Sequence, residues 1–286
     1  MAISGNGEYL TEFRNGNLFF DVIDSGPRDG ETVVLLHGFP QTASSWAAVT
    51  HILNRRGLRT VAPNQRGYSP RARPLGRLAY RLEFLIEDTE CLIDAIGTPV
   101  HLVGHDWGAA VAWLTAAKRP DLVRSLTTVS VPHPGAFIRS MFTSRQVLRS
   151  YYMGVFQVPF LPELLLRLLP SVADRILSAA GMTAEQRADT RRHIIQTSAL
   201  SGGLNWYRAL PFTAPRTMNA RVRVPTTHVW SDRDVALDRC GAERTGRYVD
   251  APFRLIVLPG VSHWVPEHRP EKLAEIIETP TRQAGE

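Results

Sequence analysis

The segment Gly104-His105-Asp106-Trp107-Gly108 constrains the fold of this 286-residue chain more than any other feature. A short apolar run, residues 99–103, comes directly before it, and small residues and strong helix formers follow over 108–117. A strand, a sharp glycine-flanked turn and a helix in this order present a nucleophile at the end of a sheet strand. The pattern therefore predicts a reactive side chain, Asp106, between a buried strand and a helix. An aspartate that merely caps an ordinary helix is the alternative.

The residue type at position 106 decides the chemistry. Turns of this kind usually carry serine, which attacks acyl carbons. A carboxylate that displaces a leaving group from a saturated carbon forms an alkyl ester, and water can open that ester at its carbonyl carbon. A serine would leave an ether at the same carbon, so Asp106 excludes serine-type ester or peptide hydrolysis.

Composition narrows the class of protein. The chain is 44% hydrophobic and 21% charged, as in ordinary globular proteins, and its charge of +6 comes from scattered arginines, so we expect no nucleic-acid partner. No signal peptide is visible, and prolines interrupt the greasiest stretch, 155–172, so we expect no membrane partner. Two cysteines without metal spacing indicate free thiols in a reducing, cytoplasmic compartment. No phosphate-binding glycine loop or metal-ligand cluster stands out, so we expect no cofactor and no metal.

Strand and helix patterns alternate over most of the chain. Strands are expected over 9–23, as a hairpin around Asn15-Gly16, and over 33–36, 58–63, 126–131, 226–230 and 254–258; helices are expected over 45–54, 83–96 and 271–277. Such alternation predicts an α/β fold with a mostly parallel central sheet flanked by helices. Residues 132–215 break it, with helical stretches over 137–151, 162–169 and 184–196. We therefore predict a core of residues 1–131 and 216–286 and an inserted all-helical cap of residues 132–215.

An aspartate nucleophile needs a base to activate water and an acid to orient that base. Asp234 follows the strand expected at 226–230, and His263 follows the one expected at 254–258, so nucleophile, acid and histidine come in the order that this kind of fold uses. We prefer Asp234 to Asp232, because apolar residues follow it and Asp232 is better placed to set the turn. Ester hydrolysis also needs an oxyanion hole, for which the backbone amides of Phe39 and Trp107 are the obvious donors.

The chain resembles the short-form, α/β-hydrolase-fold epoxide hydrolases over nearly its whole length. Four segments carry the resemblance: His37-Gly38-Phe39-Pro40, Gln65-Arg66-Gly67-Tyr68-Ser69-Pro70, Gly104-His105-Asp106-Trp107-Gly108-Ala109 and Gly260-Val261-Ser262-His263-Trp264. Two segments of the predicted cap are similar to those that supply this family's paired ring-opening tyrosines, here Tyr152 and Tyr207. Chemistry also requires such residues, because the alkoxide formed by ring opening must receive a proton or a hydrogen bond. Tyr151 is adjacent, but neighbours on a helix face different ways, so only one can face the cleft.

The chain departs from this family's pattern at two places. Asn64 stands where an aspartate is usual, and Val158-Pro159-Phe160 replaces the commoner Glu-Pro-Gly. Neither touches a reacting group, so the departures bear on loop geometry and substrate preference.

The resemblance implies a hydrolase acting on an ether bond, with an epoxide and water as partners and possible homodimerisation. A cleft lined by the aromatic residues Phe39, Trp107, Phe156, Trp206 and Trp264 would favour an apolar or aromatic epoxide. A haloalkane or haloacid dehalogenase with the same nucleophile is the alternative, although the haloalkane enzymes typically carry asparagine after His-Gly, where this chain has Phe39. A non-catalytic ligand receptor on the same fold is a second alternative, although such proteins often lose a catalytic residue and none is missing here.

Overall fold

A single sheet forms the centre of the computed structural model, which describes residues 9–283. In this part of the chain the strand order is β1-β2-β4-β3-β5-β6-β7-β8; β1 pairs with β2 and β2 with β4 antiparallel, and the other pairs are parallel. The strands are β1 (Glu12–Asn15), β2 (Leu18–Ser25), β3 (Thr32–Leu36), β4 (Arg59–Pro63), β5 (Val100–His105), β6 (Val123–Val129), β7 (Thr226–Ser231) and β8 (Phe253–Leu258). The α/β-hydrolase fold with a mostly parallel sheet is confirmed.

Local sequence explains the strands. All residues of β3 and β5 are buried, as expected for continuous apolar runs covered on both faces of a parallel sheet. The antiparallel β1 and β2 meet in the predicted hairpin, where Asn15 pairs with Leu18 and Gly16 has a φ of 56°. That backbone conformation favours glycine, so the Asn-Gly turn is explained.

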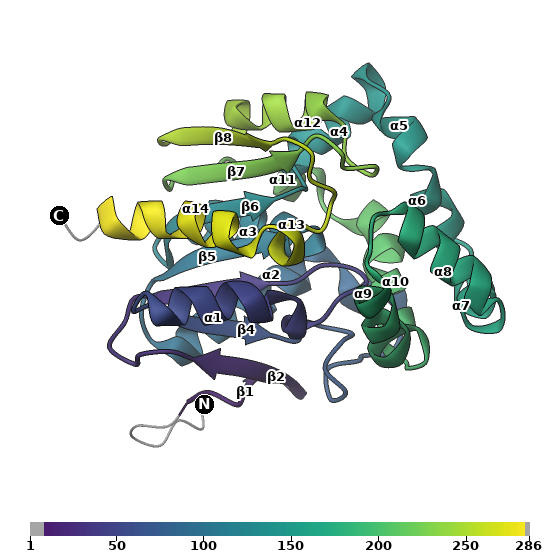
Figure 1. Cartoon of the computed structure of the whole chain (residues 1–286), viewed down its shortest axis with the longest axis horizontal. Coiled ribbons are helices and arrows are strands. Elements are labelled where there is room, and N and C mark those ends of the chain that lie inside the picture. The colour runs from purple at the N-terminus through teal and green to yellow at the C-terminus, as the bar shows by residue number, and fades with distance from the viewer. Residues whose placement is uncertain (1–8, 284–286) are drawn as a thin grey trace.

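Helices cover both faces of the sheet (Figure 1). On one face, α1 (Ala47–Arg55), α13 (Val265–His268) and α14 (Pro270–Gln283) pack a compact apolar cluster that includes Val49, Leu53 and Leu273. On the other face, α2 (Leu82–Ile96) and α3 (Trp107–Lys118) bury Leu92 and Trp113 in a second, larger cluster. No helix among residues 9–283 combines the length and apolarity needed to cross a bilayer.

Between β6 and β7 the described chain forms helices and turns without a strand, and we call residues 132–215 the inserted segment. Figure 1 shows much of it, from α6 to α10, beside the carboxyl ends of the central strands. Its helices are α4 (Pro134–Thr143), α5 (Gln146–Arg149), α6 (Tyr151–Phe156), α7 (Leu161–Leu168), α8 (Pro170–Ala179), α9 (Ala184–Thr190) and α10 (Ala199–Ala209), and α11 (Pro215–Met218) begins at its last residue. The elements of this segment are thus helices; its standing as an all-helical cap domain stays a prediction.

Several boundaries differ from the sequence prediction, and three of the differences have a local cause. The helix expected over 137–151 is divided into α4, α5 and α6; the break after α4 lies where Ser144 is extended and its hydroxyl accepts a hydrogen bond from the Gln146 amide. The helix expected over 184–196 ends at Thr190 and continues as a π-turn over Arg191–Ile195. The strand expected over 126–131 ends at Val129, because the next residue, Ser130, has a φ of 68°.

Candidate active site

Asp106 occupies a sharp turn between β5 and α3. Its φ of 52° and ψ of −122° are unusual for a residue other than glycine and mark a strained backbone. The flanking glycines make the turn possible: a Cβ on Gly104 would overlap the carbonyl oxygen of Gly108, and a Cβ on Gly108 would overlap that of Leu36. Helix α3 thus begins close against the strands, and the Asp106 side chain is held at their carboxyl end.

The Asp106 carboxylate lies between a backbone donor and a histidine. Its Oδ1 accepts a hydrogen bond of 2.8 Å from the Phe39 amide. Its Oδ2 lies 3.6 Å from Nε2 of His263, and only 12% of the side chain is exposed. A Cβ on Gly38 would collide with this carboxylate, so the turn before Phe39 also depends on glycine. The amide of Phe39 thus holds one carboxylate oxygen, and the other faces His263.

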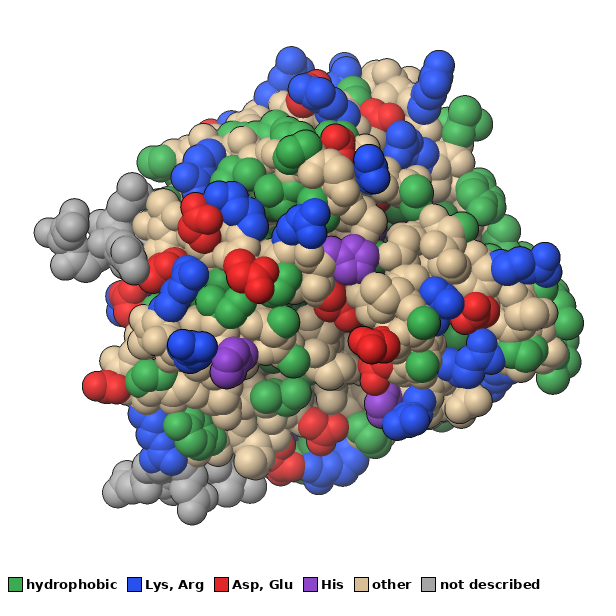
Figure 2. All heavy atoms as spheres, in the orientation of Figure 1, with side chains coloured by type: hydrophobic (Ala, Val, Ile, Leu, Met, Phe, Trp, Pro, Cys, Tyr) green, Lys and Arg blue, Asp and Glu red, His purple; other side chains and the backbone are tan. Residues whose placement is uncertain are grey.

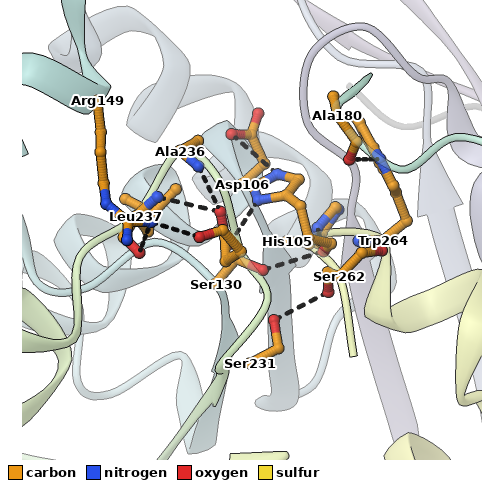
Figure 3. Close-up of polar contacts among 12 residues, drawn as sticks. His105, Asp106, Ser130, Arg149, Ala180, Ser231, Ala236, Leu237, Ser262 and Trp264 are labelled. Carbon is orange, nitrogen blue, oxygen red and sulfur yellow. Dashed lines mark hydrogen bonds and ion pairs between the residues drawn. The ribbon is translucent and has the colours of Figure 1, made fainter. Parts of the chain in front are cut away.

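Asp234, rather than Asp232, contacts the histidine. Nδ1 of His263 donates to Oδ2 of Asp234 over 2.7 Å, and the other oxygen of Asp234 accepts from the amides of Ala236 and Leu237 at 2.8 and 3.0 Å (Figure 3). Asp232 is exposed, and its Oδ1 accepts from the Gly260 amide at 2.7 Å. The two aspartates therefore have different tasks: one orients His263, and the other fixes the turn.

Two side chains hold the backbone of His263, and sequence reasoning missed both. Its carbonyl oxygen accepts from Nε2 of His105 at 2.9 Å and from the hydroxyl of Ser130 at 3.1 Å (Figure 3). Burial lowers the pKa of His105 to about 4, so this ring is neutral at pH 7. The only sequence signal was the position of His105 beside Asp106; for Ser130 there was none.

The pKa values of the buried His263 and Asp106 depend on each other. Burial lowers the pKa of His263, but the charges and hydrogen bonds of Asp234 and Asp106 outweigh burial and raise it to about 10. Burial raises the pKa of Asp106, but the hydrogen bond and charge of His263 and the Trp107 amide outweigh it and leave it below its usual value. At neutral pH the resting site thus holds an ionised Asp106 beside a protonated His263.

The inserted segment places two tyrosines above Asp106. Tyr152 of α6 and Tyr207 of α10 line a cavity of about 60 Å³ together with Asp106 and Trp107, and the two phenol rings lie 6.0 Å apart. Burial, followed by nearby negative charge, raises the pKa of Tyr152, and burial raises that of Tyr207. Tyr151 is 73% exposed and points elsewhere. Both cavity tyrosines are therefore protonated and able to donate.

Comparison with known proteins agrees with this geometry, since residues 33–276 match the family described as "Alpha/beta hydrolase family". The chain belongs to the alpha/beta hydrolase family. Within it, the chain is 31% identical to epoxide hydrolase 3 of Xenopus tropicalis, over 97% of this chain and 78% of that protein. It is 33% identical to the AB hydrolase superfamily protein YfhM of Bacillus subtilis, over 93% of this chain and 96% of that one. The crystal structure of epoxide hydrolase A from Mycobacterium thermoresistibile superposes with a TM-score of 0.81 at 26% identity, covering 95% of this chain and 97% of that chain. The predicted resemblance is confirmed.

The aromatic residues expected to line the cleft of this alpha/beta hydrolase take different places. Trp107 lines the cavity, whereas Phe39 and Phe156 pack edge-on against Tyr207, with ring centroids 5.5 and 5.0 Å away. Trp206 and Trp264 are not among the residues that line this cavity, and their contact with a substrate stays a prediction. Each indole N–H binds a carbonyl instead, Trp206 that of Arg66 and Trp264 that of Ala180, both at 2.9 Å. Much of the cavity wall is aliphatic or aromatic, including Leu82, Ala110, Val131, Phe137, Met153 and Leu237.

The two departures from the family pattern have local explanations. The side-chain oxygen of Asn64 accepts from the Ala43 amide at 3.0 Å, a bond that an aspartate could make equally well. Phe160, where glycine is commoner, has a φ of 62° and is 81% exposed. Among residues 9–283 no group of three side chains is arranged to hold a metal ion.

Proposed function

We propose that this alpha/beta hydrolase converts an apolar or aromatic epoxide to a vicinal diol through a covalent ester on Asp106. The observation that carries the proposal is one ionised carboxylate that faces two protonated phenols across a small cavity. A carboxylate supplies the nucleophile, and the phenols supply protons for an oxygen leaving group. The similarity to proteins named epoxide hydrolases supports the same reaction.

In the first step, Oδ2 of Asp106 attacks a ring carbon, because Oδ1 is held by the Phe39 amide. The carbon–oxygen bond of the ring breaks, and its electron pair stays on the ring oxygen. Tyr152 and Tyr207 hold that oxygen and deliver a proton as its negative charge develops. Helices α6 and α10 of the inserted segment, acting as a cap, keep this proton donor pair away from bulk water.

In the second step, His263 must act as a base although it is protonated in the resting site. Ester formation removes the negative charge of Asp106, which is one of the groups that raise the pKa of His263. The histidine then releases its proton more easily and can deprotonate a water, while Asp234 keeps Nδ1 protonated. That water attacks the ester carbon, and the negative charge on Oδ1 is stabilised by the amides of Phe39 and Trp107. The bond between the ester carbon and the diol oxygen then breaks, this oxygen takes up a proton, and the diol leaves the restored Asp106 carboxylate.

Trapping the ester tests the proposal. In His263→Gln, a styrene oxide-like epoxide should alkylate Asp106 without release, and mass spectrometry of the Asp106 peptide should show the mass of one epoxide. Asp106→Ala is the control and should stay unmodified. Unmodified His263→Gln with normal turnover would refute the mechanism. Haloalkanes assayed in parallel address the alternative: halide release without diol formation from epoxides would favour a dehalogenase.

A further inference from the structure

The loop that carries Asp234, residues 232–238, is bound by side chains from the inserted segment. Gln146 of α5 donates from Nε2 to the Ala236 carbonyl at 2.7 Å, and its Oε1 accepts from the Asp238 amide at 2.7 Å. A second donation, to the Ser150 hydroxyl at 2.9 Å, fixes the amide orientation. Gln146 is 0% exposed, so its amide group is fully committed to these contacts.

Arg149, on the same short helix, binds the loop from a neighbouring position. Its Nη1 donates to the carbonyl of Asp234 itself at 2.6 Å and, at 3.5 Å, to that of Leu237 (Figure 3). Its Nε lies 3.8 Å from the Asp238 carboxylate. Together, Gln146 and Arg149 bind the backbone at four of the seven residues of the loop.

These contacts decide where the Asp234 carboxylate points. One of its oxygens is occupied by the amides of Ala236 and Leu237, which leaves only Oδ2 for Nδ1 of His263. That arrangement requires the loop to curl back on the carboxylate. The carbonyls of Ala236 and Leu237 then face α5, where they accept hydrogen bonds from Gln146 and Arg149, respectively.

We propose that Gln146 and Arg149 are positioning residues for the second step of the reaction. They hold the loop in the shape that aims Asp234 at His263, so the strength of the base depends on a helix outside the core sheet. The inference rests on the proposed function, because it assigns Asp234 the role of orienting the base.

The two steps provide a kinetic signature that a merely structural role would not give. Ester formation uses Asp106 and the tyrosines, whereas ester hydrolysis uses His263 and Asp234. If only hydrolysis slows and becomes limiting, the ester accumulates, kcat and KM fall together and kcat/KM is preserved. A loss of folded enzyme would lower kcat and kcat/KM alike and leave KM unchanged.

Arg149→Met, Arg149→Lys and Arg145→Met form a matched series. The Arg149 side chain is 39% exposed, so its replacement should not prevent folding. We expect Arg149→Met to slow ester hydrolysis about tenfold, the scale of one lost charge-assisted hydrogen bond, and to accumulate ester in rapid-quench mass spectrometry. Arg149→Lys keeps a donor for the Asp234 carbonyl and should recover most of the rate. Arg145, exposed on the same segment, is the control and should behave as wild type.

Gln146→Leu, in its folded form, should show a larger joint fall of kcat and KM with more ester accumulation. The test of the positioning role does not depend on this variant, because Arg149→Met is sufficient for it. Wild-type kinetics in Arg149→Met would overturn the inference, and so would a lower kcat at unchanged KM without ester accumulation. The proposed function fails separately: it fails if His263→Gln forms no ester. If His263→Gln accumulates ester while Arg149→Met matches Arg145→Met, only the positioning role is refuted.

Discussion

The core and the inserted segment contribute different kinds of groups to the site. The core supplies two carboxyl groups and an imidazole: the side chains of Asp106, Asp234 and His263 are only 12%, 0% and 7% exposed and follow strands of the sheet. The inserted segment supplies neutral phenols and much of the apolar wall, although its outer side carries exposed apolar residues. Figure 2 shows such residues at the end of the molecule over α7 and α8, where Leu164, Leu168 and Ile176 are exposed. The charged side chains thus follow strands of the central sheet, whereas the inserted helices supply the phenol groups and much of the apolar cavity wall.

The largest expected effect is the loss of the proposed nucleophile of the core, Asp106. Asp106→Ala should lower epoxide turnover roughly 100,000-fold, because no other described side chain can form the ester. Steady-state diol formation measures this loss, and thermal unfolding checks that the protein is folded. Asp232→Ala, which removes an exposed carboxylate of the neighbouring loop, is the control and should retain most activity. Similar losses in both variants would contradict the assignment.

Removing the proposed proton donors of the inserted segment should lower activity less. Tyr152→Phe and Tyr207→Phe should each slow ester formation, and the double variant should lose about 1,000-fold, the usual scale for general acid catalysis. Rapid-quench measurement of ester formation separates this step from hydrolysis, which should be unaffected. Tyr151→Phe is the matched control, since its ring is exposed. A double variant as active as Tyr151→Phe would remove the tyrosines from the mechanism.

The charge interaction between Asp106 and His263 should be visible in the pH dependence of ester formation and of ester hydrolysis. Hydrolysis of the ester needs neutral His263, so its rate should rise about tenfold per pH unit and level off below pH 10, because the ester has removed the charge of Asp106. Ester formation should fall only in acid, as Asp106, with its lowered pKa, becomes protonated. Single-turnover measurements across pH test both curves. A hydrolysis rate that is flat between pH 5 and 9 would be inconsistent with His263 as the base.

The same pair predicts how folding stability changes with pH. The raised pKa of His263 stabilises the fold fully below its unfolded value of 6.5, and this contribution is lost as pH rises through about 10. The lowered pKa of Asp106 contributes above its unfolded value of 3.8 and is lost as pH falls through the folded value. The free energies of unfolding of wild type and His263→Gln, measured with denaturant, should therefore differ most between about pH 3.8 and 6.5. A constant difference from pH 4 to 11 would argue against the charge pair.

The smallest effect lies at the surface of the inserted segment. Phe160→Gly should raise the free energy of unfolding by up to about 1 kcal/mol, because glycine accepts the left-handed backbone at this position and little packing is lost. Phe142→Gly is a control with the opposite sign, since it puts glycine into α4 at an equally exposed phenylalanine and should cost about 1 kcal/mol. Denaturant unfolding measures both. Destabilisation by Phe160→Gly would mean that the ring packs in solution.

Sequence reasoning succeeded where the determinants are local. The strand, turn and helix around Asp106 follow from adjacent residues, and the order along the chain was enough to select Asp234 and His263 for contact. The inserted segment was harder to predict, because helix breaks such as the one at Ser144 depend on single side-chain bonds. The contact of Arg149 with the Asp234 carbonyl joins residues 85 positions apart, and neither residue carries a local sign of it.

The glycines that crowd Asp106 have a consequence for engineering this protein. A Cβ on Gly38, Gly104 or Gly108 would overlap backbone or the Asp106 carboxylate, so these three positions tolerate no larger residue without a shift of the site. Mutant libraries aimed at new substrates should leave these three codons and that of Asp106 untouched. Diversity belongs in α6 and α10 at positions other than Tyr152 and Tyr207, where changes leave the backbone around Asp106 intact.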